Sequence, residues 1–197
     1  MKKITALLLS FIVIGLCSFV LDNEIPKGLQ KGDKAPLFEG KDQHSQTVKL
    51  TDLLQKGDVV LVFYRGQWCP FCNKYLSALQ DSLGLIQKKG ASVIAISPEK
   101  QENIGMTVSK TKATFPVITD TDMKIMTAYK VNYTVDKEMQ DKLASYGLDL
   151  NKANGENGNH LPVPATYIIS KNGTIKYVFF NPDYTKRPSV KELLNLL

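Results

Sequence analysis

Residues 59–72 decide the fold, and they read Val59-Val60-Leu61-Val62-Phe63-Tyr64-Arg65-Gly66-Gln67-Trp68-Cys69-Pro70-Phe71-Cys72. The run from Val59 to Tyr64 is continuously aliphatic or aromatic, which is typical of a strand buried on both faces. Gly66 interrupts it. From Pro70 to about Lys88 the apolar residues recur at helical spacing, which predicts a helix directly after the strand.

Strands and helices alternate on either side of this stretch. Lys171-Asn172-Gly173 separates the apolar runs 166–170 and 174–180, and an Asn-Gly turn favours an antiparallel hairpin. These patterns predict an α/β arrangement, a central mixed sheet with helices on both faces. The other expected elements are a short strand at 48–50, a capped turn at 51–54, a strand at 91–96, a helix at 99–111, a strand at 115–118, a helix at 122–129, a surface helix and loop within 133–160, and a final helix at 190–197.

Composition describes a globular protein without a nucleic-acid-binding pattern. The 197 residues fit one domain with a short leader, and 43% hydrophobic content is enough for a real core. The net charge of +6 comes from dispersed lysines, since Arg65 and Arg187 are the only arginines. Nucleic-acid-binding proteins cluster basic residues and favour arginine for phosphates. We therefore expect a solvated basic surface and no nucleic-acid partner.

The N-terminus is predicted to direct the chain out of the cytoplasm. Lys2 and Lys3 precede an apolar run that ends at Leu21, which is the pattern of an export signal. Residues 1–21 fit a cleaved signal peptide, an uncleaved membrane anchor, or a lipoprotein signal ending at Cys17. All three place the domain in the periplasm or cell envelope. Residues 22–31 are polar and predict a linker, which leaves 32–197 as the domain.

Cys69 and Cys72 are the only cysteines beyond the leader. A bridge between them closes too short a loop to stabilise the fold much, so the pair is predicted to do redox chemistry. A helix N-terminus lowers the pKa of a thiol from about 8.5 towards neutrality. We expect Cys69 at the exposed helix tip, Cys72 one turn inside, and the charge of Arg65 nearby. Trp68 is either a packing residue or a contact platform beside the pair.

Other uses of the cysteine pair are less consistent with the sequence. A zinc site needs four protein ligands, or three and a water, and only His44 and His160 accompany the pair. Two structural thiols would suit a reducing compartment, which the leader argues against. We therefore predict a redox-active disulfide between Cys69 and Cys72, with no metal and no cofactor.

The segment 63–73 resembles the active-site region of the thioredoxin superfamily, in its peroxiredoxin-like (AhpC/TSA, redoxin) branch. The resemblance extends over most of 32–197. It includes Gly32-Asp33-Lys34-Ala35-Pro36-Leu37-Phe38 and the Val163-Pro164-Ala165-Thr166 stretch. It implies that Pro164 is cis and packs against the pair, with the carbonyl or N–H of Val163 available to a bound chain.

Two positions depart from the peroxiredoxin pattern Phe-Tyr-Pro-x-x-x-Thr-x-x-Cys. Cys72 takes the place of the peroxidatic cysteine, Arg65 that of the proline, and Cys69 that of the threonine. Pro164 stands where the family keeps an activating arginine. We therefore expect a thiol–disulfide oxidoreductase acting on a protein partner or reductant, with Cys69 attacking and Cys72 resolving.

Two alternatives stay open. One is a thiol peroxidase in which Cys72 reacts with a peroxide, forms a sulfenic acid and is resolved by Cys69; Arg65 would then supply the missing guanidinium. The other is a partner-binding module that keeps the fold without catalysis.

Overall fold

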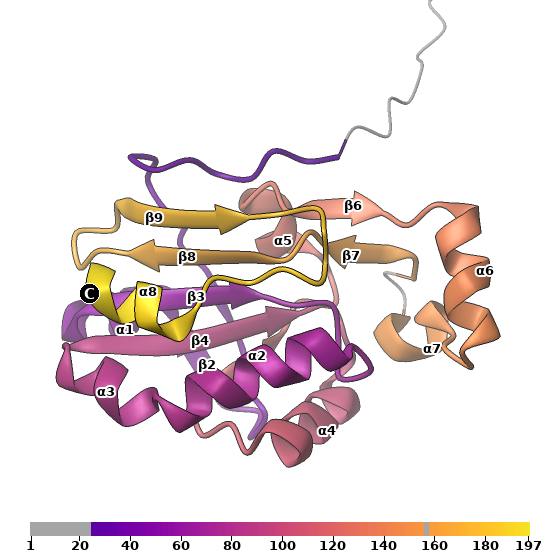
Figure 1. The fold of residues 1–197 in the computed structure, drawn as a ribbon, viewed down its shortest axis with the longest axis horizontal. Coiled ribbons are helices and arrows are strands. Elements are labelled where there is room, and N and C mark those ends of the chain that lie inside the picture. The colour runs from indigo at the N-terminus through magenta and orange to yellow at the C-terminus, as the bar shows by residue number, and fades with distance from the viewer. Residues whose placement is uncertain (1–24, 156–157) are drawn as a thin grey trace, which may run out of the picture.

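The computed structural model describes residues 25–155 and 158–197 (Figure 1). The predicted leader, 1–21, lies outside the described residues, and so does Cys17. No helix in the described part of the chain is long and apolar enough to cross a membrane. The helices are α1 (Leu50–Lys56), α2 (Pro70–Asp81), α3 (Leu83–Lys88), α4 (Gln101–Thr111), α5 (Lys124–Ala128), α6 (Lys137–Ser145), α7 (Leu150–Asn154) and α8 (Val190–Leu196).

A five-stranded mixed sheet forms the centre of the fold, in the order β5-β4-β3-β8-β9. Strand β3 pairs in parallel with β4 and antiparallel with β8, which forms the predicted hairpin with β9. The α/β expectation is thus confirmed. The strands are β1 (Glu39–Lys41), β2 (Thr47–Lys49), β3 (Asp58–Phe63), β4 (Ala91–Ser97), β5 (Val117–Thr119), β6 (Asn132–Thr134), β7 (His160–Pro162), β8 (Ala165–Ile169) and β9 (Ile175–Phe180).

Strand β3 is buried on both sides because its side chains alternate between two cores. Val60 and Val62 pack with α2, α3, α4 and α8 on one face. Val59, Leu61 and Phe63 pack with α1 and α5 on the other. This arrangement holds the C-terminal end of β3 rigidly, and the cysteine pair follows that end.

Several predicted elements are shifted by one or two residues, and two differ more substantially. The helix expected at 70–88 is divided at Ser82, whose ψ of 4° leaves the helical region, so that α2 and α3 are separate. The turn expected at 51–54 is a full helix, α1, which begins without a side-chain cap.

Residues 132–162 form an excursion from the central sheet. Strands β6 and β7 pair antiparallel at its base, and α6 and α7 lie beyond them, at the end of the sheet towards which β3 points (Figure 1). The sequence predicted a helix and a loop here, and the structure adds the two-stranded sheet. The excursion has its own small core of Val135, Leu143, Leu150 and Leu161, against which Trp68 packs.

The described part of the predicted linker 22–31 lies against the domain. Leu29 is buried with the core on the α1 face, and its N–H donates to the Tyr167 hydroxyl at 3.2 Å. Gly28 donates to the Lys130 carbonyl at 3.0 Å. Composition suggested a tether because Ile25 and Leu29 are isolated from each other among mostly polar residues, and the burial of Leu29 could not be read from that pattern.

Candidate active site

The cysteine pair is placed by a strand that ends and a helix that begins. Strand β3 ends at Phe63, and Cys69 is the N-cap of α2 with Pro70 at the first helical position. A proline suits that position because its missing N–H has no partner to lose there. Cys69 N–H donates to the Gly66 carbonyl at 3.1 Å, which closes the intervening loop.

The two sulfurs face each other as free thiols. Cys72 donates a hydrogen bond to Cys69, with 2.7 Å between the two Sγ atoms. Cys69 is 1% exposed and Cys72 is 0% exposed. The expectation of an exposed Cys69 is wrong, because side chains of the excursion and of the loop before α8 enclose the helix tip. Cys69 is among the residues that line a pocket, whereas Cys72 is not.

The pKa values of the pair are driven apart. The hydrogen bond from Cys72 lowers the pKa of Cys69 to about 6 against the effect of burial, and Arg65 and Arg187 assist. Burial, followed by the same hydrogen bond and the charge of Cys69, raises the pKa of Cys72 well above its ordinary value. At neutral pH the thiolate therefore resides on Cys69, and Cys72 holds the proton.

Both arginines of the chain lie at this site. Arg187 Nη2 is 3.3 Å from Cys72 Sγ, and its Nη1 donates to the carbonyls of Tyr184 and Lys186 at 2.9 and 2.6 Å. The Arg65 guanidinium lies between two rings, 4.2 Å from the Tyr184 centroid and 4.8 Å from that of Trp68. Sequence reasoning proposed Arg65 but missed Arg187, whose rarity in a lysine-rich chain was the available hint.

Glu99 is a second residue that sequence reasoning missed. It follows β4, is fully buried, and its Oε2 accepts from the Gln67 N–H at 2.7 Å. Burial, with the charge of Cys72 as a further contribution, raises the pKa of Glu99 to about 8. Its Oε1 and Trp68 Nε1 have no hydrogen-bond partner among the described residues.

Gly66 makes room for these two unpaired atoms. A Cβ at this position would lie 2.4 Å from Trp68 Nε1 and 2.8 Å from Glu99 Oε1, and the φ of +153° also favours glycine. The residue before the cysteine loop is therefore fixed as glycine by the close approach of both side chains.

The implied geometry of Pro164 is wrong. No peptide bond among the described residues is cis, so the bond from Val163 to Pro164 is trans. Val163 N–H donates to the Val131 carbonyl at 2.8 Å, and the Pro164 carbonyl accepts from Asn181 at 3.4 Å. The extended path from β7 into β8 uses these backbone groups, so the Val163 N–H is not free for a bound chain. Neither residue lines the pocket beside Cys69.

The pocket at Cys69 has a volume of about 320 Å³. Its floor comes from the cysteine loop and the start of α2, and its wall from α6 and the segment that follows it. Phe71 and Tyr184 close one side of the pocket. Their rings pack edge to face, with 6.0 Å between the ring centroids. The lining residues are Arg65, Trp68, Cys69, Pro70, Phe71, Met139, Lys142, Leu143, Tyr146, Leu148 and Tyr184.

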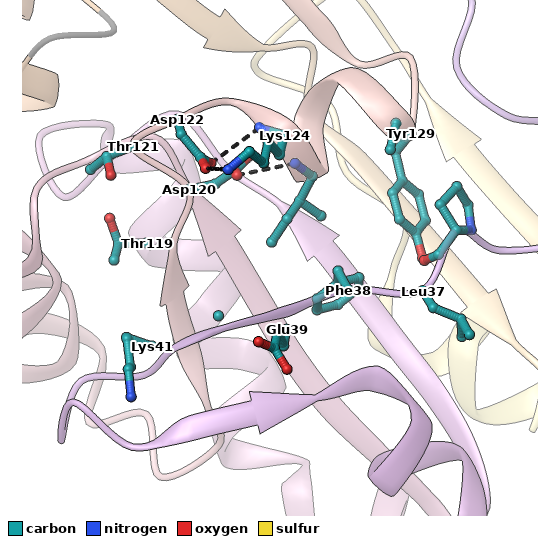
Figure 2. A pocket seen from close by; sticks show the side chains of 14 residues that line it. Leu37, Phe38, Glu39, Lys41, Thr119, Asp120, Thr121, Asp122, Lys124 and Tyr129 are labelled. Atoms are coloured by element: carbon teal, nitrogen blue, oxygen red, sulfur yellow. Dashed lines mark hydrogen bonds and ion pairs between the residues drawn. The ribbon is translucent and has the colours of Figure 1, made fainter.

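A larger hollow of about 510 Å³ lies elsewhere, between the segment leading into β1 and the start of α5 (Figure 2). Asp120 accepts from the N–H groups of Ile125 and Met126 at 3.0 and 2.8 Å, and Asp122 pairs with Lys124 at 2.5 Å. The carboxylates that line this larger hollow already have partners, and no cysteine lines it. The pocket at Cys69 is therefore the better candidate for chemistry.

No metal centre is evident in the described ranges, where no three His, Cys, Asp or Glu side chains gather closely enough to hold an ion. His160 contacts Asn132 at 3.2 Å within the excursion, and His44 is exposed. Neither histidine accompanies the cysteine pair.

The sequence is similar to those of peroxiredoxins and of a thiol-disulfide oxidoreductase. A putative peroxiredoxin of Mycobacterium tuberculosis is 34% identical over 101 residues, 51% of this chain and 64% of that protein. Chloroplastic peroxiredoxin Q of Sedum lineare is 28% identical over 89% of this chain and 81% of its own. The thiol-disulfide oxidoreductase ResA of Geobacillus thermodenitrificans is 24% identical over 75% and 67%.

The fold is also that of solved peroxiredoxins. The crystal structure of peroxidoxin BcpB from Mycobacterium tuberculosis superposes with a TM-score of 0.65 and 20% identity, covering 85% of this chain and 96% of that one. The model of the AhpC/TSA family matches residues 31–178. With that match over most of its length, and a thioredoxin-like fold, this chain belongs to the AhpC/TSA family.

Proposed function

We propose that this protein is an exported thiol–disulfide oxidoreductase in which Cys69 attacks the substrate and Cys72 resolves. The observation that carries the proposal is the inequality of the two sulfurs. Cys69 has a pKa of about 6 and lines a pocket, whereas Cys72 is sealed in the core with a raised pKa. A nucleophile needs thiolate character and a route to the substrate, and of the two residues Cys69 has the lowered pKa and the place beside the pocket.

The reaction follows from this inequality. Cys69 thiolate attacks one sulfur of a substrate disulfide, and the substrate's other sulfur leaves as a thiolate. Cys72 then loses its proton and attacks Cys69 Sγ, which releases the second substrate thiol. The protein ends with a Cys69–Cys72 disulfide, and the substrate gains two electrons and two protons. Run backwards, the same steps oxidise a dithiol.

The surrounding side chains fit these steps. Arg65 stabilises the Cys69 thiolate and Arg187 lies against Cys72, where a negative charge forms during resolution. Trp68 lines the pocket and would contact a bound substrate. The relative ResA, named a thiol-disulfide oxidoreductase, supports this reaction class.

Trapping of mixed disulfides tests the assignment of roles. The Cys72→Ser protein should accumulate a mixed disulfide through Cys69 when mixed with bis(2-hydroxyethyl) disulfide, detected by intact mass. The Cys69→Ser protein should accumulate none. Full turnover by the Cys69→Ser protein would refute the proposal.

A second candidate is a thiol peroxidase, favoured by family membership and by Arg187 at 3.3 Å from Cys72 Sγ. Cys72 thiolate would attack the peroxide oxygen, releasing water or an alcohol and leaving a sulfenic acid. Cys69 would then form the disulfide and release water. The burial and raised pKa of Cys72 oppose this order. It requires rapid consumption of hydrogen peroxide that Cys72→Ser abolishes, and a rate no faster than that of a free thiol would exclude it.

Export belongs to the same proposal and rests on residues 1–21, with the catalytic domain at 32–197. A cleaved signal, a membrane anchor and a lipid at Cys17 give different products. The mass of the mature protein and its partition between soluble and membrane fractions distinguish the three. Recovery of full-length protein in the cytoplasm would contradict export.

A further inference from the structure

The pocket beside Cys69 is lined by two cationic side chains and by no Asp or Glu, so the Cys69 thiolate is the negative group among its lining residues. Arg65 is 3% exposed, and its Nε has no hydrogen-bond partner. Lys142, on α6, is exposed and forms no ion pair with any described residue. The Arg65 guanidinium stacks on Tyr184 and Trp68, but its buried Nε donor has no acceptor, and an unmet buried donor is costly. This points to an anionic acceptor that completes the site.

The rest of the lining is apolar and aromatic. Phe71 and Tyr146 are 41% and 76% exposed, and Leu143 and Leu148 lie behind them. The combination of an apolar wall and two cations matches an amphipathic ligand with one negative charge.

The size and depth of the pocket further restrict the class of ligand that it can bind. About 320 Å³ is at the small end of the range for small-molecule sites. Cys69 is almost fully buried, so its sulfur is reached through this pocket. A flat protein surface does not enter such a hollow, whereas a small organic disulfide does.

We propose that the substrate is a low-molecular-weight disulfide whose thiol half carries an apolar or aromatic body and a carboxylate. This rests on the function proposed above. The carboxylate pairs with Arg65 and Lys142, the body packs on Phe71 and Tyr146, and one sulfur lies at Cys69. Attack gives a mixed disulfide with one half and releases the other as a thiolate; Cys72 then releases the bound half.

The test compares two aromatic disulfides that differ in charge. Reduced protein is mixed in single turnover with 5,5'-dithiobis(2-nitrobenzoate), which carries carboxylates, and with neutral 4,4'-dithiodipyridine. Each rate constant is divided by the rate constant of 2-mercaptoethanol with the same disulfide. This removes the difference in intrinsic reactivity between the two disulfides. The wild-type protein should prefer the carboxylate by roughly tenfold, as expected for one charge-assisted contact.

Matched charge reversals locate the preference. Lys142→Glu should abolish it, whereas Lys152→Glu, an equal charge change on exposed α7 outside the pocket, should leave it within about twofold. Tyr146→Ser should slow both aromatic disulfides without altering the ratio. Because Lys142 and Tyr146 are exposed, folding is expected to survive each change.

The outcomes separate this inference from the proposed function. Equal ratios for Lys142→Glu and Lys152→Glu, with normal exchange of bis(2-hydroxyethyl) disulfide, would overturn the pocket assignment alone. Faster reaction with the disulfides of insulin than with the aromatic carboxylate would also overturn it. Failure of Cys72→Ser to trap any disulfide would instead overturn the function.

Discussion

The two sides of the cysteine pair are built from different parts of the chain. The Cys69 side faces a pocket whose wall comes from the excursion at 132–162. The Cys72 side faces the core, with Arg187 and the protonated Glu99 as its polar neighbours. We propose on this basis that Cys69 meets the substrate and that Cys72 keeps its proton until resolution. Substitutions on the two sides of the pair should therefore have different effects.

Among changes at the site itself, the largest expected effect comes from filling the space at Gly66. Gly66→Ala would press a methyl group against Trp68 and Glu99, and should lower the free energy of unfolding by about 2–4 kcal/mol. Urea denaturation measures it. Gly84→Ala is the matched control, since nothing lies within 4 Å of its Cβ on helix α3, and it should stabilise by about 0.5–1 kcal/mol. Equal effects of the two would mean that the two unpaired atoms are not held where the structure places them.

Replacing each of the two arginines by methionine should slow a different step of the reaction. Arg187→Met removes the contact to Cys72 Sγ, and because a hydrogen bond to a charged group contributes about 1.5–3 kcal/mol, resolution should slow roughly tenfold to a hundredfold. The mixed disulfide with bis(2-hydroxyethyl) disulfide should then accumulate, as followed by rapid quenching and mass spectrometry. Arg65→Met should slow the first attack and leave resolution nearly unchanged. The reverse pattern would exchange the roles of the cysteines.

Glu99→Gln should change the pH dependence of stability. The pKa of Glu99 is about 8 in the fold, above the ordinary value of 4.5. The unfolded chain therefore releases this proton more readily, and stability falls as pH rises from about 4.5 to 8. Glutamine, which stays neutral, should raise the free energy of unfolding by roughly 1–3 kcal/mol at pH 9 and by little at pH 5. A gain of the same size at both pH values would show that Glu99 is not the titrating group.

The smallest effect is expected on the open side of the pair. Phe71→Ala loses an edge-to-face contact with Tyr184 on a partly exposed ring, at a cost of about 0.5–1.5 kcal/mol. Leu76→Ala, on the same helix but in the core, should cost about 2–5 kcal/mol. Thermal unfolding of both proteins compares the two faces of α2, and similar losses would contradict an open pocket over Phe71.

The sequence was sufficient to predict those elements whose local pattern agrees with their position in the fold. The apolar run of β3, the hairpin at Asn172-Gly173 and the helix start at Pro70 are each specified by neighbouring residues, and all three are confirmed. Strands β6 and β7 escaped prediction because each has three residues and little apolar alternation.

The site was harder to predict than the fold because its parts are distant in the chain. Arg187 lies 115 residues from Cys72 in sequence, and no local pattern links them. In the sequence Glu99 resembles a surface residue. It is buried because it follows β4, where its carboxylate accepts from the Gln67 N–H in the loop before the cysteines. The expectation of a cis Pro164 came from resemblance alone, and the hydrogen bond of Val163 to Val131 could not be foreseen from it.

The proposed site makes Cys69 the thiolate beside the pocket and Cys72 the protonated thiol in the core. This assignment is tested most directly by alkylating the reduced protein with iodoacetamide across pH 4–10 and locating the label by peptide mass. We predict that Cys69 is labelled first, with an apparent pKa of about 6, and that Cys72 remains unlabelled through neutral pH. Labelling of Cys72 first, or of both cysteines with a common pKa near the ordinary value, would contradict the account.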